Sequence, residues 1–275
     1  MATAVGTLVR DWRKRRRRSQ LDLALDVGVS TRHLSFVETG RSRPSPALIE
    51  ALAEELAVPL RERNALLLAA GYAPRYAETS LDAAAMARVQ TSLRRLLDSH
   101  QPYPGAVIDR DWNVVMANAA GTLLVAGASP SLLGPPLNVF RVSLHPDGMA
   151  PRILNFGEWA TYLVGELRRA AALSAAPELE ALLDEVLAYR TIQALGGWRD
   201  AAPAEEPALL VPLRLAVDGG RELSLFTTLA RFGTPQDVTL SELAVELFFP
   251  ADHASDLLLR SLAEPRPAPA TLPPT

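Results

Sequence analysis

The clearest hydrophobic pattern in the chain lies between positions 20 and 37, in the stretch QLDLALDVGVSTRHLSFV. Apolar side chains recur there at the spacing that two short helices need to bury one face against each other: Leu23, Val27, Val29, Leu34 and Val37. Ala24 allows a close helix crossing, Gly28 supplies the left-handed conformation of a sharp turn, and Ser30 caps the second helix. The stretch predicts a helix-turn-helix; the alternative is an ordinary helical hairpin in a bundle core.

Helical periodicity continues on both sides of this stretch. A first helix is expected from about Ala4 to Arg17, a fourth from Pro46 and a fifth from Pro59 to Gly71. These segments predict a small all-α domain of five helices over residues 1–76.

The next segment, residues 77–100, has a broad apolar stripe from Thr79 to Ser99 and predicts a connecting helix. Such a helix could pack on the domain that follows it. It could instead form part of a dimer seam, because two copies would give the protein a two-fold axis.

From Tyr103 onward the pattern changes to short strands separated by turns. Strands are expected at 106–109 and 113–117, then a helix at 118–125, a hairpin of 209–218 and 222–232 around Gly219-Gly220, a strand at 243–249 and a closing helix at 255–262. Residues 101–263 therefore predict an α+β domain with an antiparallel sheet and helices grouped to one side. The proline-rich tail, residues 264–275, is expected to be disordered.

Charge divides the chain at the same place as the hydrophobic pattern. Residues 1–76 carry 13 Arg and Lys against 8 Asp and Glu, a balance of +5, and the rest carries 15 against 23, a balance of -8. A basic helix-turn-helix domain beside an acidic domain indicates that only the first meets phosphate.

Side chains on the outer face of the third helix, on the loop after it and at the start of the second helix are the candidates for DNA contacts. Arg32 can bond guanine through two donors, and Phe36 could touch a thymine methyl or pack on the next helix. Arg41 and Arg43 are candidates for phosphate clamps. The full set of predicted DNA-binding residues is Gln20, Ser30, Thr31, Arg32, Ser35, Phe36, Arg41 and Arg43.

A helix expected over residues 151–171 carries an apolar stripe that could be plain core or the wall of a ligand pocket. A buried arginine at such a pocket would suit a carboxylate head group. The alternative for Arg141 and Arg152, and the more common arrangement, is a helix-end salt bridge with residues such as Asp147 or Glu158. The predicted ligand-binding residues are Arg141, His145, Arg152, Phe156, Trp159, Tyr162 and Phe226.

Several kinds of chemistry find no support in the sequence. Cysteine is absent, the four histidines are not at metal-ligand spacing, and no nucleophile or phosphate-loop motif occurs. We expect no metal, no cofactor and no enzymatic activity. No apolar run is long enough to span a membrane and no export signal is seen, so the expected location is the cytoplasm.

Two stretches resemble known families. VSTRHLSFVETGRSRPS, with QLDLALDVG before it, resembles the DNA-binding domain of XRE-family repressors, which implies a homodimer on a palindromic operator with the third helix in the major groove. DRDWNVVMANAAGTLL and PLNVFRVSLHPDGMAPRILNFGEWATYLVGELRR resemble the ligand-binding domain of MmyB-like transcription regulators, which implies a PAS-like sensor for fatty-acid-like ligands. We therefore expect a transcription regulator whose operator binding responds to a small apolar ligand; the alternative is a second domain that only dimerises or binds proteins.

Overall fold

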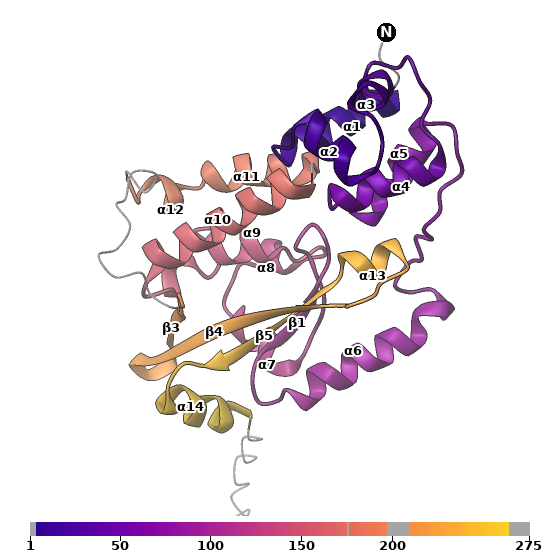
Figure 1. The fold of residues 1–275 in the computed structure, drawn as a ribbon. Coiled ribbons are helices and arrows are strands. Elements are labelled where there is room, and N and C mark those ends of the chain that lie inside the picture. Colours follow the sequence, from indigo (N-terminus) through magenta and orange to yellow (C-terminus); the bar gives the residue numbers. More distant parts are fainter. Residues whose placement is uncertain (1–3, 175, 197–209, 264–275) are drawn as a thin grey trace, which may run out of the picture. The chain divides into compact units, whose positions relative to one another are not determined.

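The computed structural model of the chain describes residues 4–174, 176–196 and 210–263 (Figure 1). The predicted tail at 264–275 lies outside the described residues. Contacts divide the chain into two compact units. The first comprises residues 1–87, 170–175 and 232–242, and the second comprises residues 88–169, 176–231 and 243–275.

The five predicted helices of the first unit are all present. They are α1 (Ala4–Arg15), α2 (Gln20–Asp26), α3 (Thr31–Glu38), α4 (Pro46–Glu55) and α5 (Leu60–Ala69). Ser30 caps α3 by accepting a hydrogen bond from the backbone N–H of His33, and Gly28 has a φ of +72°, so both local predictions for the turn are confirmed.

The core of this unit combines the predicted apolar positions with one close helix approach. Leu23, Leu34 and Val37 are 0% exposed, and Ala24 is 1% exposed. Gly6 on α1 lies against the end of α3, where a Cβ would sit 2.3 Å from the Val37 carbonyl oxygen. Helix α3 is therefore held against α1 at a distance that only glycine permits.

The connecting helix is shorter than predicted. A 3-10 turn at Ala84–Met86 leads into α6 (Ala87–Ser99), and residues 77–79 are not helical. Their backbone pairs instead with the start of α13 (Val238–Glu242): the Val238 N–H donates to the Ala77 carbonyl at 2.8 Å and the Thr79 N–H donates to Asp237 at 3.1 Å. These bonds replace the helical hydrogen bonds that the apolar stripe predicted.

The second unit contains a five-stranded sheet in which every neighbouring pair of strands is antiparallel. The strands are β1 (Gly105–Ile108), β2 (Val114–Ala117), β3 (Leu213–Val217), β4 (Arg221–Arg231) and β5 (Ala244–Pro250), in the order β2-β1-β5-β4-β3. Gly219 and Gly220 have positive φ at the connection between β3 and β4, as the sequence predicted. The expected fold class, a helical helix-turn-helix domain followed by a mixed domain with an antiparallel sheet, is confirmed.

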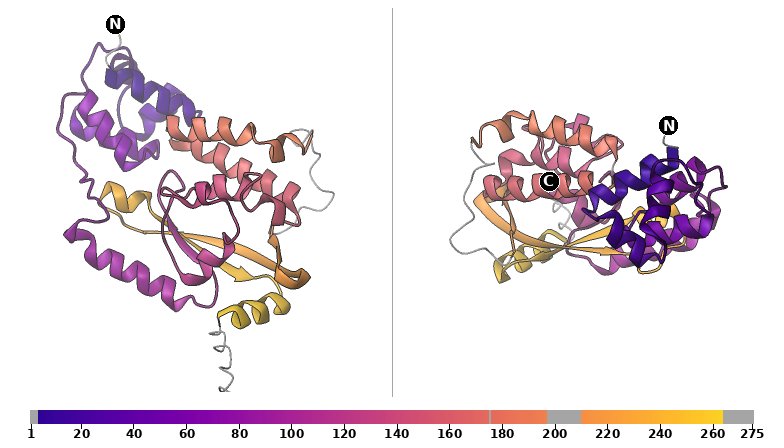
Figure 2. Two further views of the ribbon diagram at one scale, coloured as in Figure 1. Left: turned by 180° about the vertical axis from the view of Figure 1, so that it is seen from behind. Right: turned by 45° about the horizontal axis from the view of Figure 1, so that its top comes forward.

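Helices cover this sheet on both sides. The helices of the unit besides α6 are α7 (Ala119–Leu124), α8 (Pro130–Leu133), α9 (Val139–Leu144), α10 (Phe156–Ser174), α11 (Pro177–Leu187), α12 (Arg190–Gln193) and α14 (His253–Ala263). Helices α9, α10 and α11 lie together on one side, and α6 and α14 lie on the other (Figures 1 and 2). The expectation that the helices group to one side of the sheet is therefore wrong. The predicted helix 151–171 begins later, at Phe156, because Ile153 forms a bridge with Leu215 of β3 and the Leu154 N–H donates to the Arg214 carbonyl.

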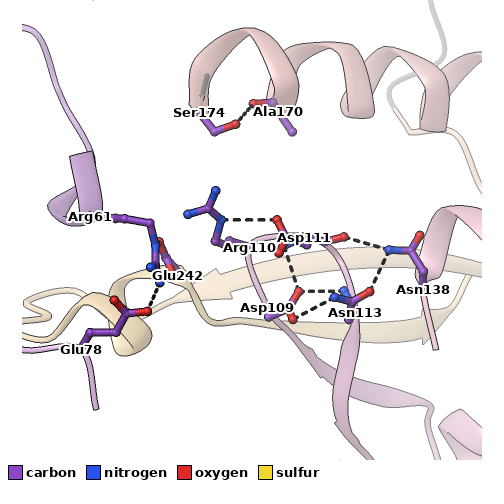
Figure 3. Close-up of polar contacts among 10 residues, drawn as sticks. All are labelled: Arg61, Glu78, Asp109, Arg110, Asp111, Asn113, Asn138, Ala170, Ser174 and Glu242. Atoms are coloured by element: carbon purple, nitrogen blue, oxygen red, sulfur yellow. Dashed lines mark hydrogen bonds and ion pairs between the residues drawn. The ribbon is translucent and has the colours of Figure 1, made fainter. Parts of the chain in front are cut away.

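A polar network shapes the turn between β1 and β2. Asp109 accepts hydrogen bonds from the backbone N–H groups of Asp111 and Asn113, and Asn138 donates to the Asp111 carbonyl (Figure 3). Trp112 between them has a φ of +64°. The carboxylate of Asp109 therefore stabilises the turn.

Candidate nucleic-acid interface and ligand cavities

The outer face of α3 presents an aromatic ring, Phe36, close to two guanidinium groups. Leu34 and Val37 turn the opposite face of the helix into the core. The Arg32 Cζ lies 5.3 Å and the Arg41 Cζ 5.7 Å from the centroid of Phe36. The Phe36 carbonyl also accepts the Arg41 N–H at 2.8 Å, so the loop after α3 is fixed to the same residue. The arrangement presents two stacked cations on the helix face predicted to read DNA.

A buried polar cluster behind this face fixes α1, α2 and α3 to one another. Glu38 is 2% exposed and accepts two hydrogen bonds from Arg13, at 2.7 and 2.8 Å, and one from the Gln20 side-chain amide at 2.7 Å. The bond to Glu38 raises the pKa of Arg13. The DNA contact predicted for Gln20 stays a prediction, and its amide nitrogen here serves the cluster.

Some of the basic residues have partners inside the domain. Arg16 donates to the carbonyls of Leu56 and Ala57, and Arg18 pairs with Asp26. Arg43, a predicted phosphate clamp, donates to the Gly71 carbonyl at 3.1 Å and lies 4.4 Å from the Tyr72 ring centroid.

Other cations of this domain form no ion pair with a carboxylate in the part of the chain that the structure describes: Lys14, Arg15, Arg17, Arg32 and Arg41. Ser30, the residue before α3, is exposed. Thr31 and Ser35 of α3 are partly exposed. The positive charge that remains for phosphate contacts is therefore concentrated at the end of α1 and just after it, on α3, and in the loop that follows α3.

A large cavity in the second unit, here named the outer cavity, has a volume of about 460 Å³. Its walls come from Gln101 and Pro102 after α6 and from α7, β3, β4 and α14. The apolar lining includes Leu124, Leu215, Leu223 and Leu259. One cation, Arg152, lines it. The Arg152 Nε is buried without a hydrogen-bond partner among the described residues, and one Nη donates to the Leu124 carbonyl.

A smaller space of about 100 Å³, here named the inner cavity, shares Leu124 with the outer cavity. Its walls come from β1, β2, α7, α9, α10 and β5. Most of the lining is apolar, but Thr122 of α7, Ser143 of α9, Trp159 of α10 and Glu246 of β5 also line it. Burial raises the pKa of Glu246 to about 7, against a hydrogen bond from Thr227 that lowers it.

Comparison with known families agrees with both halves of this description. A family model for the MmyB-like transcription regulator ligand binding domain matches residues 89–262, which hold both cavities, and a helix-turn-helix model matches residues 9–63. The chain belongs to the MmyB-like transcription regulators. The two matched models describe a ligand-binding domain of transcription regulators and a helix-turn-helix.

No curated protein matches this MmyB-like regulator. Among solved structures, a chain from an RNA-binding light-oxygen-voltage receptor matches with 15% identity and a TM-score of 0.28 over 94% of the regulator. The match spans 62% of the length of that receptor chain.

The described residues of the regulator lack two further features. They contain no cluster of three or more histidine, aspartate or glutamate side chains suited to hold a metal ion. Among the same residues, no helix is both long and apolar enough to cross a membrane.

The side chains predicted to bind ligand separate into several groups in the regulator. Arg152 lines the outer cavity and Trp159 the inner one, and Tyr162 packs on Trp159 with ring centroids 5.4 Å apart. Phe156 lines neither cavity. Phe226 stacks on Phe249, the neighbour of the cavity-lining Phe248, and so faces away from the inner cavity.

Arg141 and His145 belong to a separate polar cluster at α9 and α11. Arg141 donates to Glu185 at 2.7 Å, which lowers the pKa of Glu185, and Tyr189 donates to the same carboxylate. The His145 and Tyr189 rings lie 4.9 Å apart, edge to face. The salt bridge that the sequence left open for Arg141 therefore forms, with Glu185 as its partner.

Glu246 is the functional candidate that the sequence reasoning missed. The sequence does mark it: Glu246 is the one acidic residue in the apolar stretch LAVELFFP, two positions after Ala244 and two before Phe248. Strand alternation places it on the same face as the cavity-lining Phe248.

Proposed function

We propose that this regulator binds a palindromic operator as a homodimer, with α3 in the major groove, and that an apolar, fatty-acid-like ligand in the outer cavity changes its operator affinity. The observation that carries the ligand part is the Arg152 Nε, buried at an apolar cavity without a partner among the described residues. A ligand carboxylate would supply an acceptor for this donor and a counter-charge for the guanidinium.

The volume and lining of the outer cavity support an apolar ligand. Its volume of about 460 Å³ falls within the range of about 300–1,000 Å³ usual for small-molecule sites. Two leucines of the lining, Leu123 and Leu262, are 51% and 43% exposed, which is unusual for the wall of an empty core. A bound hydrocarbon chain would cover them and gain their burial.

Chain connectivity supplies a route from the cavity to the DNA-binding unit. Strand β4 carries the lining residue Leu223 and continues into residues 232–242, which belong to the first compact unit although the ligand-binding family model includes them. Arg61 of α5 anchors this segment by donating to Glu242 at 2.8 and 2.9 Å, and also pairs with Glu78 at 2.6 Å (Figure 3). A ligand that shifts β4 would act on the segment held by α5.

Operator binding with and without ligand tests the proposal. Duplexes selected from a random pool by the full-length protein would be titrated by fluorescence anisotropy at fixed salt, with and without decanoate. We expect decanoate to change the half-saturation concentration by about fivefold or more. The change should vanish in Arg152→Gln and persist in Arg190→Gln, which alters an arginine 78% exposed outside the cavity. An unchanged isotherm with decanoate bound, as measured by calorimetry, would refute the proposal.

A further inference from the structure

The inner cavity is lined by Thr122, Ser143, Trp159 and Glu246 among its polar side chains, and the proposal above uses none of them. Glu246 and Trp159 line it together with apolar side chains such as Leu163, Val142 and Phe248. Glu246 and Trp159 are deeply buried, at 9% and 4% exposed. Polar groups in such a space need a reason, because each costs free energy when its hydrogen bonds are incomplete.

Glu246 sits in the middle of the sheet. Its backbone is paired with Ala106 of β1 on one side and Leu229 of β4 on the other. Its carboxyl group accepts a hydrogen bond from Thr227, and no ion pair with a cation forms among the described residues. An apolar residue at this position would serve the fold better, so the acid is best explained by a partner that enters the cavity.

Trp159 offers the complementary group. Its indole Nε1–H is buried and has no acceptor in the described part of the chain. Leaving such a donor without an acceptor costs about 1–3 kcal/mol. A ligand atom that accepts this hydrogen bond would recover that loss.

We infer that the inner cavity binds a small apolar molecule, or the end of one, through a neutral group that both accepts and donates a hydrogen bond: a hydroxyl or a primary amide. The ligand oxygen accepts from Trp159 Nε1, and its O–H or N–H donates to Glu246. This subsite is distinct from the outer cavity and its Arg152, and it does not depend on the function proposed for that cavity.

Charged head groups fit these two residues poorly. A carboxylate could accept from Trp159, but it would lie next to a second carboxyl group that repels it when ionised. An ammonium group has no lone pair to accept from Trp159, so the indole donor would stay unsatisfied. A neutral donor and acceptor satisfies both residues without a buried charge.

The volume sets the size of the ligand. An engineered cavity of about 150 Å³ in another protein holds benzene, and the inner cavity is about 100 Å³. A chain of about four carbons with its polar group is therefore a suitable probe. Four probes share that chain and differ in the polar group: 1-butanol, butanamide, butanoate and butylammonium.

The indole N–H signals of the full-length, ¹⁵N-labelled protein report binding directly. The chain has four tryptophans, and Trp159→Phe identifies the signal of Trp159. We expect 1-butanol and butanamide to shift this signal saturably downfield at neutral pH, with butanoate and butylammonium binding about tenfold or more weakly. The proposal is overturned when a charged probe binds as well as the alcohol, or when none of the four moves the signal.

Two variants sharpen the result. Glu246→Gln keeps the shape and a donor and acceptor while removing the charge, so it should narrow the difference between butanamide and butanoate. Glu222→Gln removes an exposed carboxylate that pairs with Arg214 on the same sheet and should leave the order of the probes unchanged. If Glu246→Gln does not fold, the order in which the four probes bind to the natural protein still tests whether the inner cavity prefers a neutral polar group.

No DNA is present in this experiment, so it separates the inner subsite from the proposed regulation. A Trp159 shift with 1-butanol in a protein whose operator binding ignores decanoate would refute the proposed function and leave the subsite standing. The reverse result would refute the subsite alone.

Discussion

Two glutamates are buried among the described residues, one in each compact unit, and their surroundings differ. Glu38 at the end of α3 is 2% exposed and receives three hydrogen bonds, two of them from the guanidinium of Arg13. Glu246 of β5 is 9% exposed and has Thr227 as its hydrogen-bond donor, with no cation paired to it among the described residues. The first carboxylate is satisfied within the fold, whereas the second faces a cavity.

The difference indicates separate roles. A buried carboxylate with a matched guanidinium orders the helices around it, and its loss exposes the partner charge. A buried carboxyl group that lacks a cation lowers stability whenever it ionises, so it is retained for what it binds. Substitutions at the two positions should therefore change stability in opposite directions.

The largest expected effect is the loss of the Glu38 cluster. Glu38→Gln would leave the Arg13 charge largely buried without its partner, since Arg13 is 12% exposed, and should destabilise α1 and α3 by about 3–5 kcal/mol. Hydrogen exchange of the α1 and α3 amides in the full-length protein measures this. Glu54→Gln, on the exposed side of α4, is the matched control and should change protection by less than about 0.5 kcal/mol.

Glu246→Gln should have the opposite sign above neutral pH. Because burial raises the pKa of Glu246 from 4.5 to about 7, ionisation costs the folded state stability as pH rises from about 4.5 to 7, and the cost is constant above that range. The variant should thus be more stable than the natural protein at pH 8, by at most about 3 kcal/mol, and no more stable at pH 4.5.

Denaturant unfolding at pH 8 and pH 4.5, monitored by circular dichroism, measures the difference in the free energy of unfolding between Glu246→Gln and the natural protein. The titrating neighbour Tyr162 of α10 has a raised pKa, from burial first and then from nearby carboxylates including Glu246, so it stays neutral throughout this range. Glu222→Gln serves as the exposed control. Equal curves for Glu246→Gln and the natural protein at pH 8 would show that Glu246 is not held in an apolar site.

The same contrast between satisfied and unsatisfied groups applies to the cations of the DNA-binding face. Arg43 has internal partners at Gly71 and Tyr72, whereas Arg32 stacks on Phe36 and pairs with no carboxylate among the described residues. Arg32→Ala should weaken binding to the selected operator by about 1–3 kcal/mol if Arg32 reads a base. Anisotropy on an unrelated duplex is the comparison: an equal loss there would assign Arg32 to phosphate instead.

The smallest expected effect on stability concerns the anchor of the segment 232–242. Arg61 is 32% and Glu242 14% exposed, so Glu242→Gln should cost less than about 1 kcal/mol. We nevertheless expect it to reduce the effect of decanoate on operator affinity. Glu78→Gln removes the more exposed carboxylate on the same arginine, 55% exposed, and should keep most of the effect. Equal ligand responses in both variants and the natural protein would exclude this segment as the route.

Local chemistry explains why the DNA-binding unit could be predicted closely from its sequence. The serine cap of α3, the positive φ of Gly28 and the buried set around Leu23 and Leu34 are all determined by neighbours within a few positions. The cluster around Glu38 was not predicted, because its partner Arg13 lies 25 positions away.

The ligand residues depended on longer-range information. Arg141 pairs with Glu185, 44 positions away, and Phe226 faces away from the inner cavity because of strand register with β5. Arg152 and Trp159 could be predicted because a periodic apolar stripe with an arginine beside it is typical of a helix that lines a core or a pocket. Glu246 carried its own signal, since an acid at an inward position of an apolar strand is costly unless it is used.

The central claim, that ligand and operator influence one another, is tested most directly by measuring the coupling from the ligand side. Calorimetric titration of decanoate into the protein, alone and saturated with selected operator, gives two dissociation constants. Thermodynamic linkage requires their ratio to equal the factor by which decanoate changes operator affinity, about fivefold or more. The account predicts that operator changes decanoate affinity by the same factor by which decanoate changes operator affinity. Identical decanoate affinities with and without operator would contradict it.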